Sequence, residues 1–169
     1  MYAATVPTPL GPFTLVTAPA GILAAGFTED LAVLLAELPR PLRKHRPAPG
    51  GAAVEPYASA VTAYFDGELT ALDALPVVQS GSDFRLAAWR EMRRVRPGAT
   101  VSYQELAARA GSPAAARAAG AACAYNLVPL VVPCHRVRRS DGTLGNYYYG
   151  LDAKRWLLAH ESGSGSGVQ

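Results

Sequence analysis

A cysteine, a histidine and an arginine stand next to one another in this chain, at Cys134, His135 and Arg136. They end an apolar run that begins at Asn126 and contains two prolines, which disfavour a regular helix and stiffen the backbone. A thiolate is a strong nucleophile, and a histidine that takes the thiol proton through one bound water would generate it. The pattern therefore indicates nucleophilic chemistry at Cys134, against the alternative of a buried, inert cysteine.

Length and composition are typical of one or two small globular domains. The chain has 169 residues, of which 50% are hydrophobic and 17% charged, enough for a buried core and too apolar for a disordered chain. No apolar run approaches the roughly 20 residues of a membrane span. The N-terminus lacks a basic region followed by an apolar block, so we expect a cytoplasmic protein with no membrane association.

The sequence holds few cysteines and histidines that could bind a metal ion. Cys123 and Cys134 are expected to be free thiols in a reducing compartment. The three histidines are scattered and show no metal-ligand spacing. We therefore expect neither a metal nor a cofactor.

Charge is unevenly distributed along the chain. Residues 1–80 hold four Lys/Arg and seven Asp/Glu, a net charge of −3, whereas residues 81–169 hold twelve and six, a net charge of +6, which together give the total of +3. The half with the cysteine is thus the basic half, as an anionic partner such as DNA requires. The alternative is that arginine follows a general Ala/Gly/Pro/Arg bias of the coding sequence.

The first half of the chain alternates between β and helical patterns. Apolar alternation predicts a β-hairpin over 13–17 and 22–27, and a short helix follows over 30–38. Residues 39–51 contain four prolines, four basic residues and two glycines, which predicts a mobile loop. A helix is predicted over 53–65, and a strand over 75–78.

The second half is predicted to be mostly helical. Ser82 caps a predicted helix over 83–95, and a capping box at 102–105 starts another helix at Tyr103 that ends near Gly111. Ser112 and the proline after it then predict an N-cap and first turn for a further helix to about residue 124. Two short helices separated by a tight turn are typical of a helix-turn-helix, whose second helix meets DNA.

The second of these helices is unusually slim. Small side chains let a backbone approach a DNA groove closely, although tight packing inside a core is an alternative use of them. The small residues are Ala114, Ala115, Ala116, Ala118, Ala119, Gly120, Ala121 and Ala122. From residue 162 the chain reads Ser-Gly-Ser-Gly-Ser-Gly, which predicts a flexible tail over 162–169.

Val-Pro-Cys-His-Arg-Val at 132–137 resembles the signature of the O6-alkylguanine-DNA alkyltransferases. The agreement extends to residues 9–12 and 64–67, and is nearly continuous over 83–161. The resemblance implies an α/β fold: a small N-terminal α+β domain over 1–80 with an antiparallel hairpin-based sheet, and a mostly helical C-terminal domain over 81–161 with a helix-turn-helix.

The resemblance also implies an activity. Proteins of this family move an alkyl group from O6-alkylguanine, and this one would also act on O4-alkylthymine, irreversibly onto their own cysteine. They bind double-stranded DNA through the minor groove and flip the damaged base out of the duplex, which costs a few kcal/mol that protein contacts must offset. The expected protein is a monomer with no obligate protein partner, and it reacts once.

Roles carry over to matching positions. Cys134 is the nucleophile, His135 accepts its proton through water, and Glu161 holds His135 in the required tautomer. Tyr103 donates a hydrogen bond to the leaving guanine, and Arg136 is expected to bond backbone or carboxylate groups.

The base and the DNA have their own predicted contacts. The main-chain carbonyls of Cys134 and Val137 correspond to acceptors for the exocyclic amine of guanine, and Asn126 braces the turn that holds the cysteine. Arg117 would fill the gap left in the base stack. Four small residues of the same helix would line the groove: Ala115, Ala116, Ala118 and Gly120.

Three positions depart from the family pattern, two of them at the predicted pocket. Tyr147 matches, but Tyr148 and Tyr149 replace small residues, and Leu127 replaces a frequent proline. The two additional rings would stack on the flipped base, exclude bulky adducts, or point outward.

Three other functions compete with this hypothesis. A module that binds alkylated DNA without repairing it commonly carries tryptophan in place of the cysteine, which this chain keeps. An alkyltransferase specialised for other adducts would use Tyr148 and Tyr149 to reshape the pocket. A cysteine hydrolase is disfavoured because no separate histidine or oxyanion motif accompanies the thiol.

Overall fold

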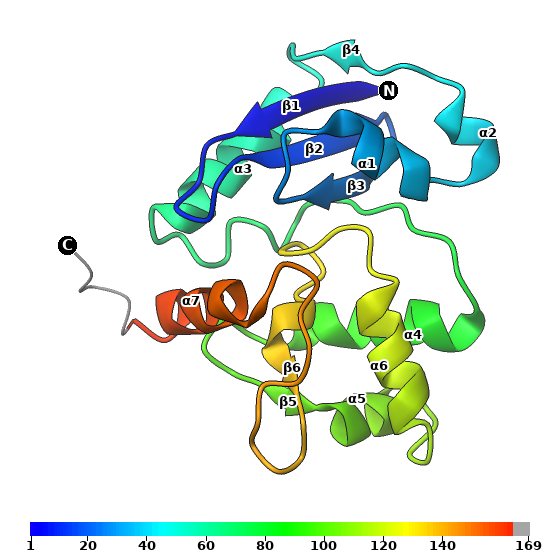
Figure 1. Cartoon of the computed structure of the whole chain (residues 1–169), viewed down its shortest axis with the longest axis vertical. Helices are drawn as coiled ribbons and strands as arrows, with labels where there is room; N and C mark the ends of the chain where they lie inside the picture. The colour runs from blue at the N-terminus through cyan, green and yellow to red at the C-terminus, as the bar shows by residue number, and fades with distance from the viewer. Residues whose placement is uncertain (164–169) are drawn as a thin grey trace. The chain divides into compact units, whose positions relative to one another are not determined.

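The computed structural model describes residues 1–163 and divides into two compact units, one over Met1–Gln79 and one from Ser80 onward. The predicted tail over 162–169 lies largely outside the described residues; Ser162 and Gly163 form a turn after the last helix. Each unit has its own secondary structure and its own buried residues (Figure 1).

The N-terminal unit is built on a four-stranded sheet of order β3-β2-β1-β4. Its strands are β1 (Tyr2–Val6), β2 (Phe13–Ala18), β3 (Gly21–Gly26) and β4 (Ala48–Pro49). The predicted hairpin is confirmed as the antiparallel pair β2 and β3, both almost wholly buried. Strand β1, which was not predicted, pairs antiparallel with β2 and parallel with β4.

Three helices complete this unit: α1 (Leu31–Glu37), α2 (Arg40–Arg43) and α3 (Glu55–Phe65). Helix α1 packs against β3, and α3 packs against β1. The segment predicted as a loop over 39–51 contains α2 and β4. The strand predicted over 75–78 is wrong, because only a single bridge joins Val77 to Ile22.

The C-terminal unit is mostly helical, as predicted. Its elements are α4 (Asp83–Arg94), β5 (Val101–Ser102), α5 (Tyr103–Arg109), α6 (Ala116–Ala124), the 3-10 helix η1 (Cys134–Arg136), β6 (Val137–Arg138) and α7 (Leu151–Glu161). The Ser82 hydroxyl accepts from the Arg85 N–H at 3.3 Å, and the Ser102 hydroxyl accepts from the Glu105 N–H at 3.0 Å. Both serine caps are thus where they were predicted.

Helices α4, α5 and α6 pack on one another. The indole N–H of Trp89 in α4 donates to the Ala122 carbonyl in α6 at 2.9 Å, which ties the two helices together. The predicted cap at Ser112 is wrong: residues 112–115 form a turn in which the Ala115 N–H donates to the Ser112 carbonyl, and α6 begins at Ala116 without a side-chain cap.

Candidate active site

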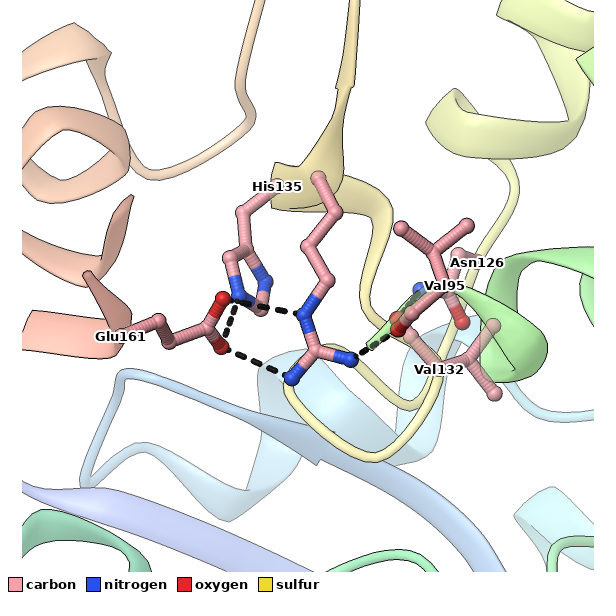
Figure 2. A network of polar contacts seen from close by, with 6 residues as sticks. Val95, Asn126, Val132, His135 and Glu161 are labelled. Carbon is pink, nitrogen blue, oxygen red and sulfur yellow. Dashed lines mark hydrogen bonds and ion pairs between the residues drawn. The ribbon is translucent and has the colours of Figure 1, made fainter. Parts of the chain in front are cut away.

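Asn126 braces the turn that leads to Cys134. Its side-chain oxygen accepts from the Val128 N–H at 3.1 Å. Its side-chain nitrogen donates to the Val132 carbonyl at 2.7 Å, and both residues are labelled in Figure 2. The Cys134 N–H donates to the same Val132 carbonyl at 2.8 Å. Within this turn Leu130 has a φ of 69°, a left-handed conformation that costs energy for a residue other than glycine. One amide therefore fixes both ends of a strained turn that presents the thiol.

A two-stranded parallel sheet brings Tyr103 to the same place. Val101 in β5 pairs with Val137 in β6, directly after the Cys-His-Arg segment. Tyr103 follows β5 as the first residue of α5. The pairing of β5 with β6 thus brings Tyr103 close to the Cys-His-Arg segment. Tyr103 is near enough to Cys134 for the thiol to raise the pKa of the phenol.

His135, Arg136 and Glu161 form a buried hydrogen-bonded network (Figure 2). The Nε2 atom of His135 lies 2.7 Å from Oε1 of Glu161, and both side chains are fully buried. Arg136 donates to both Glu161 oxygens, at 2.9 and 2.8 Å, and to the Val95 carbonyl at 2.6 Å. A bidentate guanidinium and an imidazole thus share one carboxylate.

The charges of this network fix the histidine tautomer. Burial alone would raise the pKa of Glu161, but hydrogen bonds and charge from His135 and Arg136 outweigh it and lower that pKa. Burial lowers the pKa of His135, against the opposing effect of Glu161. The pair is therefore an ionised carboxylate and a neutral imidazole, with the proton on Nε2. Nδ1 is then a buried acceptor that makes no hydrogen bond to any described residue.

The Cys134 thiol is buried, with 9% of the residue exposed. Burial raises its pKa, although a hydrogen bond from Asn126, the positive charge of Lys154 and backbone N–H groups act in the opposite direction. The resting residue is therefore a neutral thiol, and a thiolate forms only if a neighbouring base takes the proton. Both cysteines of the chain are free thiols.

Lys154 is a fully buried residue of α7 that was not predicted to belong to the site. Its ammonium group donates to the carbonyls of Val137 at 2.7 Å, Leu144 at 2.5 Å and Asn146 at 3.4 Å. One cation thus fastens the loop after η1 to α7. Its position three residues before buried Leu157 and seven before Glu161 is the available signal, because that spacing places it on the buried face.

The carbonyls predicted to bind guanine already have one protein partner each. The Val137 carbonyl accepts from Lys154, and the Cys134 carbonyl accepts from the Val137 N–H. A carbonyl oxygen has two lone pairs, so each keeps one acceptor position for a base.

Tyr103 packs against a glycine of the facing loop. A Cβ atom added at Gly145 would lie 2.7 Å from the Tyr103 hydroxyl oxygen, so only glycine allows this approach. Burial, followed by the nearby Cys123 and Cys134, raises the pKa of Tyr103 to about 12. The phenol is therefore protonated at neutral pH and available as a hydrogen-bond donor.

Replacing Gly145 by alanine should displace Tyr103. The rate of any reaction at this site in which Tyr103 takes part should then fall by up to about 100-fold. The matched control is Gly142→Ala in the same loop, which has a φ of 87° against 72° at Gly145 but nothing within 4 Å of the added Cβ. Both variants bear similar backbone strain, and only one meets Tyr103. Equal rates of cysteine alkylation in the two variants would contradict the role of this contact.

The three consecutive tyrosines form an edge-to-face cluster. The ring centroids of Tyr147 and Tyr149 are 5.7 Å apart, and those of Tyr148 and Tyr149 are 4.9 Å apart. Tyr148 is 82% exposed, whereas Tyr147 and Tyr149 are half-buried. Tyr148 thus points outward, and Tyr149 is the additional ring that packs next to Tyr147.

The predicted DNA contacts gather on α6 and the turn before it. Arg117 and Ala118 are exposed, and Ala115, Ala116 and Gly120 are half-buried. Gly120 also lies next to Tyr103, whose ring would be 4.0 Å from an added Cβ. The slim face of α6 therefore lies beside the residue proposed to meet the base.

Acidification should destabilise this unit. In the folded protein the pKa of His135 lies below its ordinary 6.5, and the pKa of Glu161 lies below its ordinary 4.5. The unfolded chain therefore binds more protons than the folded one. The free energy of unfolding falls as the pH drops through 6.5, and it falls further below 4.5. The slope should reach about 1.4 kcal/mol per pH unit for each proton. Urea unfolding between about pH 2.5 and 8 measures this slope. Glu161→Gln should lose the steep part below 4.5, and a flat profile would contradict the assigned charges.

Two further features concern ligands and membranes. Among residues 1–163, no three His, Cys, Asp or Glu side chains gather in a group suited to a metal ion. No helix in this part of the chain has the length and hydropathy needed to cross a membrane.

A buried thiol, followed by a histidine that an ionised carboxylate orients, is the arrangement of proteins that use cysteine as a nucleophile. Comparison with known proteins narrows the class. Residues 1–79 match the family model described as 6-O-methylguanine DNA methyltransferase, ribonuclease-like domain, and residues 83–163 match its DNA binding domain.

Two named relatives are similar to parts of this chain. The mouse methylated-DNA–protein-cysteine methyltransferase is 55% identical over 87 residues, which are 51% of this chain and 41% of the mouse protein. The bifunctional transcriptional activator/DNA repair enzyme Ada of Escherichia coli is 37% identical over 142 residues, 84% of this chain and 40% of Ada. The chain thus spans less than half the length of these two proteins.

A solved structure covers nearly the whole chain. The OGT protein of Mycobacterium tuberculosis in complex with DNA superposes with a TM-score of 0.82 at 31% identity, covering 97% of this chain and 94% of that one. This chain belongs to the 6-O-methylguanine DNA methyltransferase family.

Proposed function

We propose that this protein repairs DNA by transferring the alkyl group of O6-alkylguanine to Cys134, once per molecule. The observation that carries the proposal is the buried carboxylate-oriented histidine that directly follows a thiol, with Nδ1 as its open acceptor. The same reaction on O4-alkylthymine is part of the proposal.

The proton path follows from the tautomer. A water between Nδ1 of His135 and the Cys134 thiol takes the thiol proton and passes a proton to Nδ1, while Glu161 stabilises the imidazolium that forms. The thiolate sulfur attacks the alkyl carbon, so that an S–C bond forms as the C–O6 bond breaks. The thioether is stable, which makes the protein self-inactivating.

The leaving group is a guanine with a developing negative charge. The Tyr103 phenol, whose pKa of about 12 lies well above neutral pH, donates to this base and stabilises the charge. The proton lost from the thiol ends on guanine by way of the relay and solvent. No atom beyond the lesion and the protein is consumed.

DNA binding is assigned to α5, α6 and the turn between them. We propose that they act as a helix-turn-helix in which α6 enters the minor groove, with Arg117 occupying the place of the flipped nucleotide. Its exposed position and the small residues around it support this assignment. We expect a cytoplasmic monomer that needs no protein partner.

The test is intact mass spectrometry after incubation with a duplex that contains O6-methylguanine. The expected result is one added methyl group per protein, located on the Cys134 peptide, with no second turnover. A folded, DNA-bound protein whose thiol stays unmodified would favour the alternative of a module that only binds lesions.

The tyrosine cluster should influence which adducts react. Tyr149→Gly removes the half-buried ring beside Tyr147, so the benzyl-to-methyl ratio of transfer rates should fall by up to about tenfold, the value of one aromatic contact. Tyr148→Gly is the control, since that side chain is exposed and its loss should change the ratio less than about twofold. A ratio that rises in Tyr149→Gly would show that this ring excludes bulky adducts; an unchanged ratio would remove the tyrosines from adduct selection.

A further inference from the structure

The N-terminal unit carries all its lysines and arginines in one short stretch. Arg40, Arg43, Lys44 and Arg46 are the four cations of residues 1–79, and they fall within seven positions, which we call the basic segment. The seven acidic residues of this unit are spread from Glu29 to Asp73. A general bias toward arginine would spread the basic residues along the unit, as the acidic ones are spread. Their clustering therefore needs another explanation.

The basic segment presents bare positive charge. Arg40 and Arg43 lie in α2 and Lys44 is its C-cap, so their spacings of three and four place them on one side of the turn. All four side chains belong to exposed residues, and within residues 1–163 none of them forms an ion pair with a carboxylate. Like charges at these spacings repel one another and oppose folding. An external polyanion would relieve that repulsion.

The segment is held by the fold at both ends. Leu42 packs against a buried cluster that includes Leu38, and the Arg43 Nε donates to the Leu38 carbonyl at 2.5 Å. On the other side Pro47 is buried, and the Ala48 N–H donates to the Met1 carbonyl at 3.0 Å as β4 joins β1. In Figure 1 α2 lies at the right-hand edge of this unit, on the stretch of chain that leads from α1 to β4. The backbone that carries these charges is therefore held in place, which lowers the entropic cost of binding.

We propose that the basic segment binds the sugar–phosphate backbone of duplex DNA, as a contact surface additional to α6. The inference rests on the proposed function only in taking DNA as the polyanion. Backbone contacts of this kind carry no base specificity; they add affinity that depends on salt. The chemistry required of the partner is a row of closely spaced phosphates, which matches several guanidinium and ammonium groups on one short turn.

The experiment uses the full chain and an undamaged duplex of about 25 base pairs, so it does not depend on alkyl transfer. The variant is Arg40→Gln/Lys44→Gln/Arg46→Gln, which spares Arg43 because that side chain bonds Leu38. The plot of log binding constant against log salt should become shallower by about 0.9 for each phosphate that the variant no longer neutralises, up to about 3. The matched control Arg40→Lys/Lys44→Arg/Arg46→Lys keeps the charge and should keep the slope.

Transfer from free O6-benzylguanine, which has no phosphate, provides the second readout. Its rate should be equal in the triple variant and the unchanged protein, and absence of transfer in both would count against the proposed function while leaving the DNA slope informative. An unchanged slope in the triple variant would overturn the inference. So would an equally shallow slope in the charge-preserving control, or a charge-dependent binding to phosphatidylserine vesicles without any change on DNA.

Discussion

Glu161→Gln should slow alkyl transfer by about 100-fold or more and destabilise the protein by about 3 to 5 kcal/mol. In the proposed mechanism the ionised carboxylate, which bonds His135, stabilises the protonated imidazole during proton transfer. General acid–base catalysis of this kind contributes about 100-fold to 10000-fold. The lower stability follows because Arg136 keeps a buried charge without its counterion. Single-turnover kinetics and urea unfolding measure the two effects.

A second substitution separates these effects. Arg136→Met/Glu161→Gln removes the unpaired charge as well, and replacing a buried pair by neutral groups is often close to neutral for stability. The double variant should therefore recover much of the stability and remain slow in transfer. Recovery of the transfer rate together with stability would show that Glu161 is only a structural residue.

Lys154→Met should cost about 3 kcal/mol or more of stability and should also raise the pKa of the Cys134 thiol. Methionine fills similar space but leaves the carbonyls of Val137, Leu144 and Asn146 without this donor. A buried carbonyl without a donor costs about 1 to 3 kcal/mol, and the bond to Val137 is the buried one. The thiol pKa changes because the positive charge of Lys154 favours the thiolate. Urea unfolding and the pH dependence of thiol alkylation by iodoacetamide measure the two effects.

Arg155→Met is the matched control on the same helix. Arg155 is the next residue, its side chain is 61% exposed, and it pairs with Asp152 at the surface. Exposed pairs contribute little, so this variant should change stability by less than about 0.5 kcal/mol and leave the thiol pKa unaltered. A similar change in both variants would assign the effect to α7 in general and not to the buried cation.

Local signals predicted the elements that local interactions determine. Ser82 and Ser102 cap helices because a hydroxyl satisfies an N–H three residues away, an interaction that needs nothing distant. The hairpin of β2 and β3 is equally local, since a short turn and apolar alternation specify it. Ser112 has the same hydroxyl group as the other two serines, but residues 112–115 form a backbone turn, and α6 begins only at Ala116.

The features that were missed depend on residues far away in the sequence. Strand β1 has only a weak alternating pattern and exists because β2 and β4 pair with it on either side. Lys154 looks like a solvated lysine until the loop over 137–146 surrounds it with carbonyls. The role of Glu161 was inferred from the resemblance alone, because an acid at a helix end is ordinarily exposed, and its burial against His135 and Arg136 is a property of the fold.

The raised pKa of the buried Cys134 thiol bears on how long an unused molecule lasts. A protein that is consumed by its own reaction loses a whole molecule to every accidental encounter with an oxidant or a small electrophile. A neutral, enclosed thiol reacts slowly with such compounds, because the thiolate is the reactive form. Under the proposed function, the same burial that makes thiolate formation depend on His135 preserves the supply of intact molecules, and with it the number of lesions that can be repaired during exposure to alkylating agents.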